Sequence, residues 1–534
     1  MSANRCDKKN SLRRLICLLI CLLLCLSGCR AGSTSGAGRG NDENNRTAYE
    51  IFVSSFCDSN GDGIGDINGI RSKLDYISDL GFDAVWLTPV HPSATYHKYD
   101  VDDYYGIDPS FGTLEDYESF LKECHDKDIR VYMDLVLNHT SDEHAWFRAA
   151  SDYLHELHSG WEPDTAYCKY YDYYNFSREA HDGYTHLEGT EWYYEAGFWS
   201  EMPDLNLSSE AVRTEIRDIM AFWLNKGVDG FRLDAVTSYY EGNTEANTEF
   251  LHWLKETADS IDPDCYLVGE AWTDRDTIAS LYTSGIDSLF DFPFADEEGL
   301  IAKALKGSCS ASEYVDNMIW TEEAYGRANQ DYVEAPFYTN HDMNRSASYY
   351  PGDNGAVTKM AYAMNLFMPG NAFVYYGEEL GMDGLGKDEN RRAPMYWSGD
   401  PGDPGMCAGP PYMDPVQMKF PPLADQANDK QSIYNWFKEV IRVRNAYPAI
   451  AEGVTQKADL ICDGKVAAFI RSSEKDDDLL IVMNLSGQNV RKNLLVSAKG
   501  FRLAEKLCTN DEKITYKKKT LTMPACSIAV FVHK

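Results

Sequence analysis

An arginine and an aspartate stand two residues apart at the end of an apolar stretch, in Gly230-Phe231-Arg232-Leu233-Asp234-Ala235-Val236. Alternate residues of a β-strand point to the same face, so a strand here would bring the side chains of Arg232 and Asp234 together. A guanidinium keeps a neighbouring carboxylate ionised and fixed in direction, which a carboxylate nucleophile at a sugar carbon requires. A buried structural ion pair would have the same spacing, so the pair needs support from the rest of the chain.

The segments that must position this pair alternate between strand and helix. Apolar runs of strand length are mostly followed by helical periodicity, which indicates parallel strands buried on both faces. Eight strands are predicted, at residues 50–53, 84–90, 129–137, 228–235, 266–270, 288–292, 335–339 and 372–376. Helices are predicted at residues 70–80, 114–127, 209–226, 247–261 and 432–446. This α/β pattern predicts a closed (β/α)8 TIM barrel.

Polar residues gather at the ends of these predicted strands. In a (β/α)8 barrel the C-terminal strand ends carry the chemistry, so such residues would face one mouth. They are Asp134, Asn138 and His139 after the third strand, Arg232 and Asp234 after the fourth, Glu270 after the fifth, and Asn340, His341 and Asp342 after the seventh. Any one of them could belong to a structural ion pair, but the agreement of several strand ends indicates an active site rich in carboxylates.

Composition limits the classes of function. A chain of 534 residues can hold a large domain and one or two smaller ones. Its formal charge of −34 argues against a nucleic-acid partner, because a phosphate backbone is bound through Lys and Arg. An acidic balance instead suits a secreted surface and calcium sites. We expect a monomer.

A targeting segment precedes the part expected to fold. A basic stretch is followed by an apolar run, residues 15–26, that is too short to span a bilayer as a mature helix. The run ends in Leu26-Ser27-Gly28-Cys29, which resembles the lipobox of bacterial lipoproteins. The resemblance implies removal of residues 1–28, acylation of Cys29 and anchoring at the extracellular face of the bacterial cell membrane, with residues 29–46 as a flexible tether. An ordinary signal peptide or a membrane anchor that is not cleaved is the alternative.

Five of the 14 cysteines lie in that targeting segment, which leaves nine for the mature chain. These nine are scattered and show no CxxC spacing. The pattern argues against a zinc cluster or a dense disulfide framework, and it predicts mostly buried thiols.

A loop rich in Asp, Asn and Gly, residues 58–66, has the spacing of a cation site. Oxygen ligands would come from alternate positions, with glycines between them that let the backbone curl. They are the side chains of Asp58, Asn60, Asp62 and Asp66 and the carbonyl of Ile64. An EF-hand is excluded because its twelfth position, normally Glu, is Gly69 here. The sequence therefore predicts bound Ca²⁺; a turn without metal is the alternative.

Four motifs together resemble one enzyme family. They are Asp134-Leu135-Val136-Leu137-Asn138-His139, Gly230-Phe231-Arg232-Leu233-Asp234, Gly269-Glu270-Ala271-Trp272 and Thr339-Asn340-His341-Asp342. In this order they resemble the conserved regions of the α-amylase family, which comprises retaining α-glucoside hydrolases and transglycosylases. The resemblance runs from about residue 47 to the C-terminus. It implies a catalytic barrel at 47–139 and 206–450 that is interrupted by a domain B at 140–205. A C-terminal β domain at 451–534 agrees with short alternating strands predicted at 466–471, 479–484 and 528–532.

The resemblance also implies residue roles. Asp234 would be the nucleophile, Glu270 the general acid/base, and Asp342 the carboxylate that binds the sugar hydroxyls and favours ring distortion. The residues implied to bind or orient the sugar are Tyr99, Asp134, His139, Arg232, His341, Asp388 and Arg392. For Asp388 and Arg392, a solvent-exposed salt bridge is the alternative. Asn138 would be a ligand of a second calcium site. A retaining mechanism needs two carboxyl groups roughly 5–5.5 Å apart, one ionised and one protonated.

The substrate preference is less well defined. Met202-Pro203-Asp204-Leu205-Asn206 resembles a form between those of oligo-1,6-glucosidase and neopullulanase relatives, while Thr237 and Ser238 stand where typical α-amylases carry Lys and His. The leading hypothesis is an endo-acting α-amylase that cuts α-1,4 bonds in an α-glucan, starch or maltodextrin. An exo-acting α-glucosidase, an oligo-1,6-glucosidase or a 4-α-glucanotransferase with the same residues is the second hypothesis. A glucan-binding protein without catalysis is the third, and the three intact carboxylates argue against it.

Overall fold

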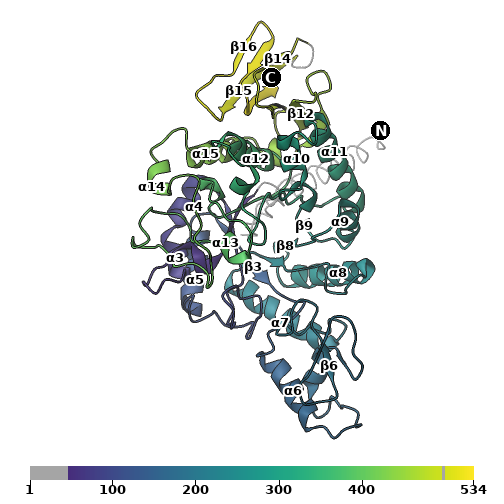
Figure 1. Cartoon of the computed structure of the whole chain (residues 1–534). Coiled ribbons are helices and arrows are strands. Elements are labelled where there is room, and N and C mark those ends of the chain that lie inside the picture. Colours follow the sequence, from purple (N-terminus) through teal and green to yellow (C-terminus); the bar gives the residue numbers. More distant parts are fainter. Residues whose placement is uncertain (1–45, 496–498, 534) are drawn as a thin grey trace, which may run out of the picture. The chain divides into compact units, whose positions relative to one another are not determined.

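The central feature of the fold is a parallel sheet of seven strands in the order β10-β1-β2-β3-β7-β8-β9 (Figure 1). This computed structural model describes residues 46–495 and 499–533, so Cys29 and all of the predicted tether except Arg46 lie outside the described residues. The strands are β1 (Thr47–Ile51), β2 (Ala84–Leu87), β3 (Arg130–Leu135), β7 (Gly230–Leu233), β8 (Tyr266–Gly269), β9 (Ser288–Leu289) and β10 (Ala372–Tyr375). Every residue of β2, β7, β8 and β10 is buried, as expected for parallel strands covered on both faces.

The eighth position of the barrel is filled by an extended segment rather than a regular strand. Ala335 forms an isolated parallel bridge with Phe290, the residue after β9. The N–H of Phe373 in β10 donates to the Pro336 carbonyl at 2.8 Å. The predicted strand at 335–339 is therefore wrong beyond this one bridge. Pro336 has no N–H to donate and interrupts the ladder.

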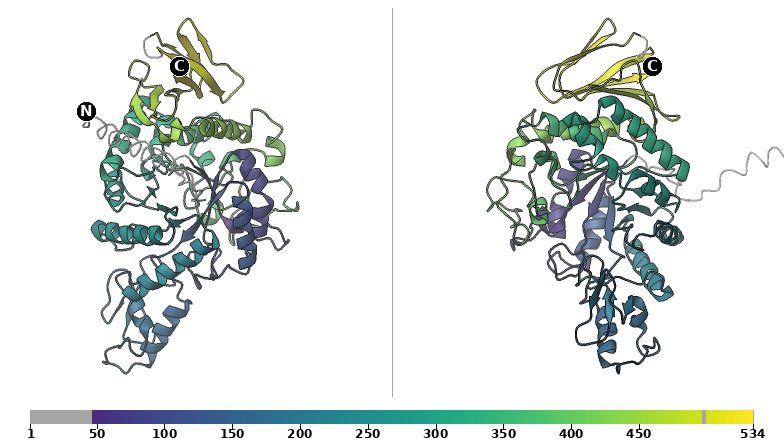
Figure 2. Two further views of the ribbon diagram at one scale, coloured as in Figure 1. Left: turned by 180° about the vertical axis from the view of Figure 1, so that it is seen from behind. Right: turned by 45° about the vertical axis from the view of Figure 1, so that its right-hand side comes forward.

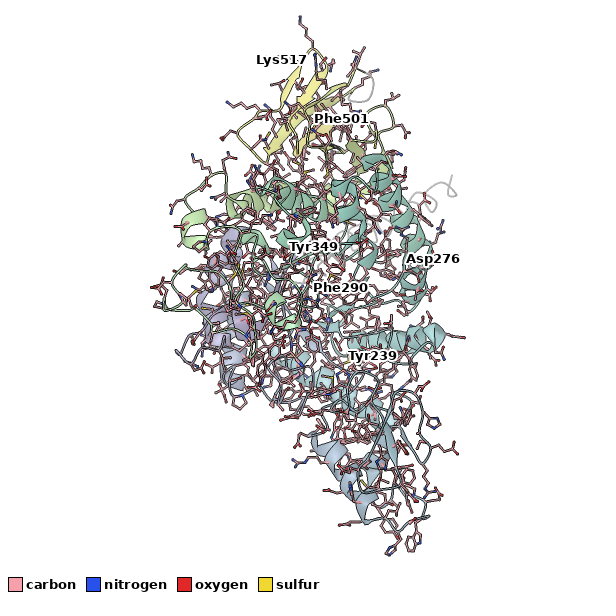
Figure 3. All side chains as sticks on the ribbon, in the orientation of Figure 1. Tyr239, Asp276, Phe290, Tyr349, Phe501 and Lys517 are labelled. Atoms are coloured by element: carbon pink, nitrogen blue, oxygen red, sulfur yellow. The ribbon has the colours of Figure 1, made fainter. Side chains whose placement is uncertain are left out.

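Helices lie around the outside of these strands (Figures 1 and 2). The longer ones are α5 (Leu114–His125), α7 (Glu210–Lys226), α8 (Thr244–Ile261), α9 (Arg275–Tyr282), α11 (Ala311–Ala328), α12 (Ala356–Leu366) and α15 (Ile433–Ala446). The barrel interior is filled by aromatic side chains, among them Trp86, Tyr132, Tyr266 and Phe290. Phe290 is labelled near the middle of the barrel in Figure 3. The predicted (β/α)8 architecture is confirmed.

The helix predicted over residues 70–80 is two helices. α3 (Ile67–Ser72) is capped by Asp66, whose side chain accepts from the Gly69 N–H at 2.7 Å, and α4 (Leu74–Leu80) follows after a break at Lys73. Lys73 has a ψ angle of 6°, and its N–H donates to Ile70 three residues back, as in a tightened last turn. Helical periodicity alone does not reveal this break.

The segment predicted as domain B leaves the barrel after β3. It contains α6 (Ala145–Glu156), a 3₁₀ turn η2 (Lys169–Tyr173) and a small antiparallel sheet of β4 (Phe176–Ser177), β6 (Tyr193–Glu195) and β5 (Tyr184–His186). Its tyrosines pack against other aromatic rings of the segment, among them Phe147 of α6 and Phe176 of β4. The chain returns beside its starting point, because His139 forms an antiparallel bridge with Asp204.

The C-terminal part consists of two antiparallel sheets, as predicted. One is formed by β11 (Val454–Lys457), β12 (Val466–Ser472), β13 (Leu479–Asn484), β18 (Ser527–His533) and β15 (Phe501–Cys508). The other is formed by β14 (Val490–Asn493), β17 (Thr520–Met523) and β16 (Thr515–Lys517). Helix α11 packs against β11 and β12, so the barrel and this domain share an interface.

The cysteines within the described ranges are nine free thiols, five buried and four half-buried, in line with the prediction that most of these thiols are buried. None of the helices between residues 46 and 533 that the structure describes is long and apolar enough to cross a bilayer.

Candidate active site

One arginine connects three carboxylates at the C-terminal ends of β3, β7 and β8. Arg232 Nη1 donates to Asp234 Oδ1 at 2.7 Å and to Asp134 Oδ1 at 2.9 Å, and Nη2 lies 2.9 Å from Glu270 Oε1. Charge-assisted bonds of this kind fix both partners in direction. The predicted nucleophile and the predicted acid/base are therefore held by the two ends of one planar guanidinium.

Strand register produces this arrangement. Asp134 of β3 pairs with Arg232 of β7, and Leu233 pairs with Gly269 of β8, so that Asp234 and Glu270 directly follow adjacent strands. Ala235, the next residue, has a φ of 45°, in the left-handed region. The turn aims the Ala235 N–H at Glu270 Oε2, 3.2 Å away.

Asp134 lies beneath the other two carboxylates. It is fully buried, and its Oδ2 accepts from Trp86 Nε1 at 3.1 Å and from the Tyr99 hydroxyl at 3.0 Å. Burial raises the pKa of Asp134 to about 7, against the lowering effect of Arg232. The structure shows Asp134 bonded to Arg232 and Tyr99, which it positions, and the predicted sugar contact of Asp134 stays a prediction.

Burial also controls the charge of the two reacting carboxyl groups. It raises the pKa of Asp234 and of Glu270, and at both positions the Arg232 guanidinium opposes the rise. At Glu270, the carboxylates of Asp234 and Asp342 raise the pKa further. A single guanidinium cannot neutralise three carboxylates, so this cluster is suited to hold a proton on one of them.

His341 lies between two acids on the far side of the site. Its Nδ1 is 2.7 Å from Glu50 Oε1, and its Nε2 is 3.1 Å from Asp342 Oδ2. Burial by itself would lower the pKa of His341, but Asp342 and Glu50 raise it to about 10. Although burial works against it, the imidazolium together with Arg392 holds the pKa of Asp342 well below its usual range. Asp342 is therefore ionised.

Arg392 continues the row of charged side chains formed by Glu50, His341 and Asp342 toward the surface. Its Nη2 bonds to Asp342 Oδ1 at 2.6 Å and lies 3.3 Å from Asp388 Oδ2, while Nη1 donates to the Tyr96 hydroxyl at 2.7 Å. Arg392 is buried, and only Asp388 is half-exposed. Arg392 thus connects Asp342 to the exposed Asp388, and a sugar-binding role for the pair stays a prediction.

Tyr99 and His139 line the same mouth. The Tyr99 ring stacks on His341, with centroids 5.4 Å apart, and its hydroxyl lies 2.7 Å from His341 Nε2. His139 Nε2 is buried and has no hydrogen-bond partner among the described residues. Burial lowers the pKa of His139 to about 4, so the ring is neutral. A buried nitrogen without a partner is one that a sugar hydroxyl can satisfy.

Asn138 has a partner within the protein. Its amide Nδ2 donates to Asp204 Oδ1 at 3.0 Å, which fastens the end of domain B to β3. A calcium-binding role for Asn138 therefore stays a prediction.

The loop at residues 58–66 is curled by its own side chains. Asp58 accepts from the Asn60, Gly61 and Gly63 N–H groups at 2.7–2.9 Å, and Gly61 and Gly63 have φ of 86° and 90°. Asp66 instead accepts from Ser59 and caps α3. No three His, Cys, Asp or Glu side chains in the described ranges form a metal-binding group. The oxygen donors suit a hard cation, which would also need Asn60 and the Ile64 carbonyl.

Three residues of the site were not predicted. Glu50 fixes His341, Trp86 fixes Asp134 and lies under the Arg232 guanidinium at 5.0 Å, and Tyr96 fixes Arg392. Glu50 and Trp86 belong to apolar strands and are separated from their partners by many residues. An acidic residue inside the buried strand β1 is the one signal that could have revealed Glu50.

Comparison with known proteins identifies the family to which this set of site residues belongs. A profile described as the α-amylase catalytic domain matches residues 50–453. The chain belongs to the α-amylase family. It is therefore a glycoside hydrolase of that family, and the four motifs that resemble the family all lie inside the matched range.

Individual relatives of the family differ in specificity. The chain is 37% identical to alpha-amylase 3 of Dictyoglomus thermophilum, over 83% of this chain and 85% of the relative. It is 31% identical to the probable oligo-1,6-glucosidase 3 of Bacillus subtilis, over 82% and 90% of the two chains. The solved structure of Eubacterium rectale Amy13B superposes with a TM-score of 0.90 at 45% identity, covering 92% of this chain and 96% of that one.

Proposed function

We propose that the chain is a retaining, endo-acting α-amylase that hydrolyses α-1,4-glucosidic bonds of starch and maltodextrins. The observation that carries the proposal is the shared guanidinium, which binds Asp234 through Nη1 and Glu270 through Nη2. Double displacement at a glycosidic carbon requires one ionised and one protonated carboxyl group, and a proton held within this cluster can be carried by Glu270, whose pKa Asp234 and Asp342 raise further.

In the first step, Glu270 would give its proton to the glycosidic oxygen while Asp234 attacks the anomeric carbon. Arg232 holds Asp234 Oδ1, which leaves Oδ2 for the attack. The bond to the leaving glucan breaks, and a glucosyl ester of Asp234 forms. In the second step, Glu270 takes a proton from water, and that water oxygen displaces Asp234 from the same carbon.

Asp342 would act on the sugar rather than on the bond. Both of its oxygens are held, Oδ1 by Arg392 and Oδ2 by His341, which keeps the ionised carboxylate rigid. A rigid carboxylate can accept bonds from neighbouring sugar hydroxyls and strengthen them as the ring flattens toward the transition state. The neutral His139 Nε2 supplies a further hydrogen-bonding position.

Endo action is favoured by the relative named alpha-amylase 3, which is more similar than the oligo-1,6-glucosidase relatives. Exo action or transfer with the same residues remains the second candidate, supported by the oligo-1,6-glucosidase relatives. The two are separated by a product time course on starch, pullulan and maltotriose. Endo action predicts an early fall in iodine staining and a mixture of maltodextrins; glucose as the only product from the first time points would refute it.

Two further features complete the proposal. The loop at residues 58–66 would bind Ca²⁺ through Asp58, Asn60, Asp62, the Ile64 carbonyl and Asp66, and the ion would stabilise the loop that leads into α3.

Acylated Cys29 would anchor the enzyme at the extracellular face of the membrane, where a polymer too large for import is available. The wild type should then incorporate labelled fatty acid and Cys29→Ser should not; a wild type without the label would contradict the anchor.

A further inference from the structure

A group of basic side chains lies on the smaller of the two C-terminal sheets. Residues 486–534 contain ten Lys and Arg but three Asp and Glu, in a chain whose formal charge is −34. Four of these cations are exposed: Arg491 of β14, Lys517 of β16, and Lys518 and Lys519 of the turn between β16 and β17. We call these four residues the basic tip. None of them belongs to the active site, so their grouping calls for a separate explanation.

Strand register brings two members of the basic tip to one face of the sheet. Arg491 lies opposite Thr522 of β17. Lys517 lies opposite Thr520 of the same strand. Residues that lie opposite each other in antiparallel strands share a face, and Leu521, which points to the other face, is fully buried. The face that carries Arg491 and Lys517 is therefore the outer one, and Figure 3 shows the Lys517 side chain pointing away from the sheet.

The turn adds two lysines and lies beside an exposed leucine. Lys518 and Lys519 have φ of 47° and 64°, in the left-handed region where a two-residue hairpin favours Asn and Gly. Lysine at both positions gives up this preference, so what the two residues contribute is charge. The Leu494 N–H donates to the Lys519 carbonyl at 2.8 Å, which places Leu495 next to the turn. Leu495 is 64% exposed.

Acidic side chains do not neutralise the basic tip. Within the described ranges, none of its four side chains forms an ion pair. Lys492, on the inner face of the same sheet, is paired with Asp463. Glu512 lies at the other end of β14, where its carboxylate accepts from Asn489. An uncompensated positive charge on an otherwise acidic molecule is attracted to an anionic surface, and salt screens this attraction.

The described chain begins close to the C-terminal sheets. The backbone N–H of Arg46 donates to Asn371 Oδ1 at 2.8 Å. The N–H of Gly370 donates to the Ala451 carbonyl at 3.0 Å, and the same carbonyl accepts from Arg471 Nη2 of β12 at 3.3 Å. The chain between Cys29 and Arg46 can span at most about 60 Å. An anchor at Cys29 would therefore hold the side of the molecule that carries the C-terminal sheets near the membrane.

We propose that the basic tip, together with Leu495, binds the anionic phospholipid headgroups of this membrane. The inference goes beyond the proposed glycosidase activity, and its choice of a membrane rests on the proposed anchor at Cys29. Lys and Arg are attracted to an anionic bilayer, and an exposed leucine can enter the boundary between its headgroups and acyl chains. A second point of attachment besides the anchor fixes the orientation of the enzyme, because the same surface repels the acidic remainder of the chain.

The test uses the chain from residue 30 to residue 534, which lacks the anchor and keeps every described helix and strand. Sedimentation with vesicles at low ionic strength measures its binding, either to mixed phosphatidylglycerol and phosphatidylcholine or to phosphatidylcholine alone. We expect binding to the anionic vesicles only, and its loss in 1 M salt, where the Debye length is about 3 Å. Combining Lys517→Gln, Lys518→Gln and Lys519→Gln should lower the partition coefficient by about a hundredfold.

The control combines Lys122→Gln, Lys127→Gln and Lys169→Gln. It makes the same change in net charge at exposed lysines of the barrel and domain B, and it should bind the anionic vesicles as the wild type does. Failure of the wild type to bind these vesicles, or an equal loss in the two triple variants, would overturn the inference. Binding of a soluble polyphosphate without binding of the vesicles would assign the basic tip to a phosphate polymer and would overturn it as well.

Starch hydrolysis by the same proteins separates this inference from the proposed function. Both triple variants should hydrolyse starch at the wild-type rate, because their substitutions lie outside the active site. A wild type that hydrolyses starch but does not bind anionic vesicles refutes the membrane contact alone. A wild type that binds the vesicles but does not hydrolyse starch refutes the proposed activity and leaves the membrane contact supported.

Discussion

At the scale of single residues, replacing each of the two reacting carboxyl groups held by Arg232 should affect the reaction in a different way. Glu270→Gln removes the proton donor, so kcat on starch should fall by about 10²–10⁴. Fluoride is a leaving group that needs no proton, so the first step on α-maltosyl fluoride should survive in this variant. Asp234→Asn removes the attacking oxygen and should abolish both reactions.

The release of fluoride in the first turnover, compared with the rate on starch, measures this difference, and thermal melting checks that both variants fold. Equal loss of Glu270→Gln on the two substrates would refute its assignment as the acid. Near-normal hydrolysis by Asp234→Asn would refute the nucleophile. Tyr412→Ala is the matched control, because this side chain is 88% exposed and belongs to no part of the site.

Glu50 gives rise to a prediction about pH. The folded-state pKa of His341, about 10, lies above its ordinary value near 6.5. The imidazolium therefore adds stability that is fully present below about pH 6.5 and is lost as pH rises toward 10. Glu50→Gln removes one of the acids that raise this pKa, so its deficit in unfolding free energy should be largest at pH 6 and should shrink toward pH 10.

Urea denaturation at several pH values measures this deficit. A deficit that stays constant from pH 6 to pH 10 would contradict the role given to Glu50. Glu389→Gln serves as the control, since Glu389 forms no ion pair within the described ranges and its substitution should not alter the pH profile.

The residues that sequence reasoning found differ from those it missed for a physical reason. Arg232 and Asp234 were predictable because two residues on one strand share a face, and Glu270 and Asp342 because all strand ends open at one mouth. Glu50 and Trp86 act across the barrel, on residues 291 and 48 positions away. Such contacts follow from strand order and register, which local spacing does not encode.

At the scale of elements, the same limit appears at Pro336 and Lys73. Apolar composition predicted a strand at 335–339, but a residue without an N–H cannot continue a ladder. Periodicity predicted one helix at 70–80, but the break at Lys73 depends on how α3 is held at Asp66 and on how its last turn tightens. Elements with one uninterrupted signal, such as α7 and β13, were predicted to within a residue.

The loop before α3 carries a prediction about metal removal. A cation that binds only the folded loop stabilises it by mass action, so EDTA should lower the melting temperature and Ca²⁺ should restore it. Asp62 is exposed and accepts a single hydrogen bond, from Ile64, so Asp62→Ala should remove this response with little damage to the fold. A melting temperature that is unchanged after verified metal removal would count against calcium here.

At the scale of the whole molecule, the C-terminal sheet is joined to the barrel through a buried charge. Arg471 of β12 is fully buried, and its Nη1 lies 2.8 Å from Glu322 Oε1 on α11. Its Nε and Nη2 donate to the carbonyls of Ala449 and Ala451, at the end of the barrel. The guanidinium therefore satisfies acceptors from both domains at once.

Removing that side chain should uncouple the C-terminal sheets from the barrel. Arg471→Ala leaves the largely buried Glu322 carboxylate without its cationic partner and removes one donor from each of two carbonyls, at a cost of about 3–5 kcal/mol in unfolding free energy. The matched control is Arg148→Ala, because Arg148 pairs with Glu143 at the surface with both side chains more than half exposed, and such pairs contribute about 0–1 kcal/mol. Calorimetry should show a lower melting temperature for Arg471→Ala and an earlier, separate transition for the C-terminal sheets. A single unfolding transition with the wild-type melting temperature would show that the two domains are held together by apolar packing and not by Arg471.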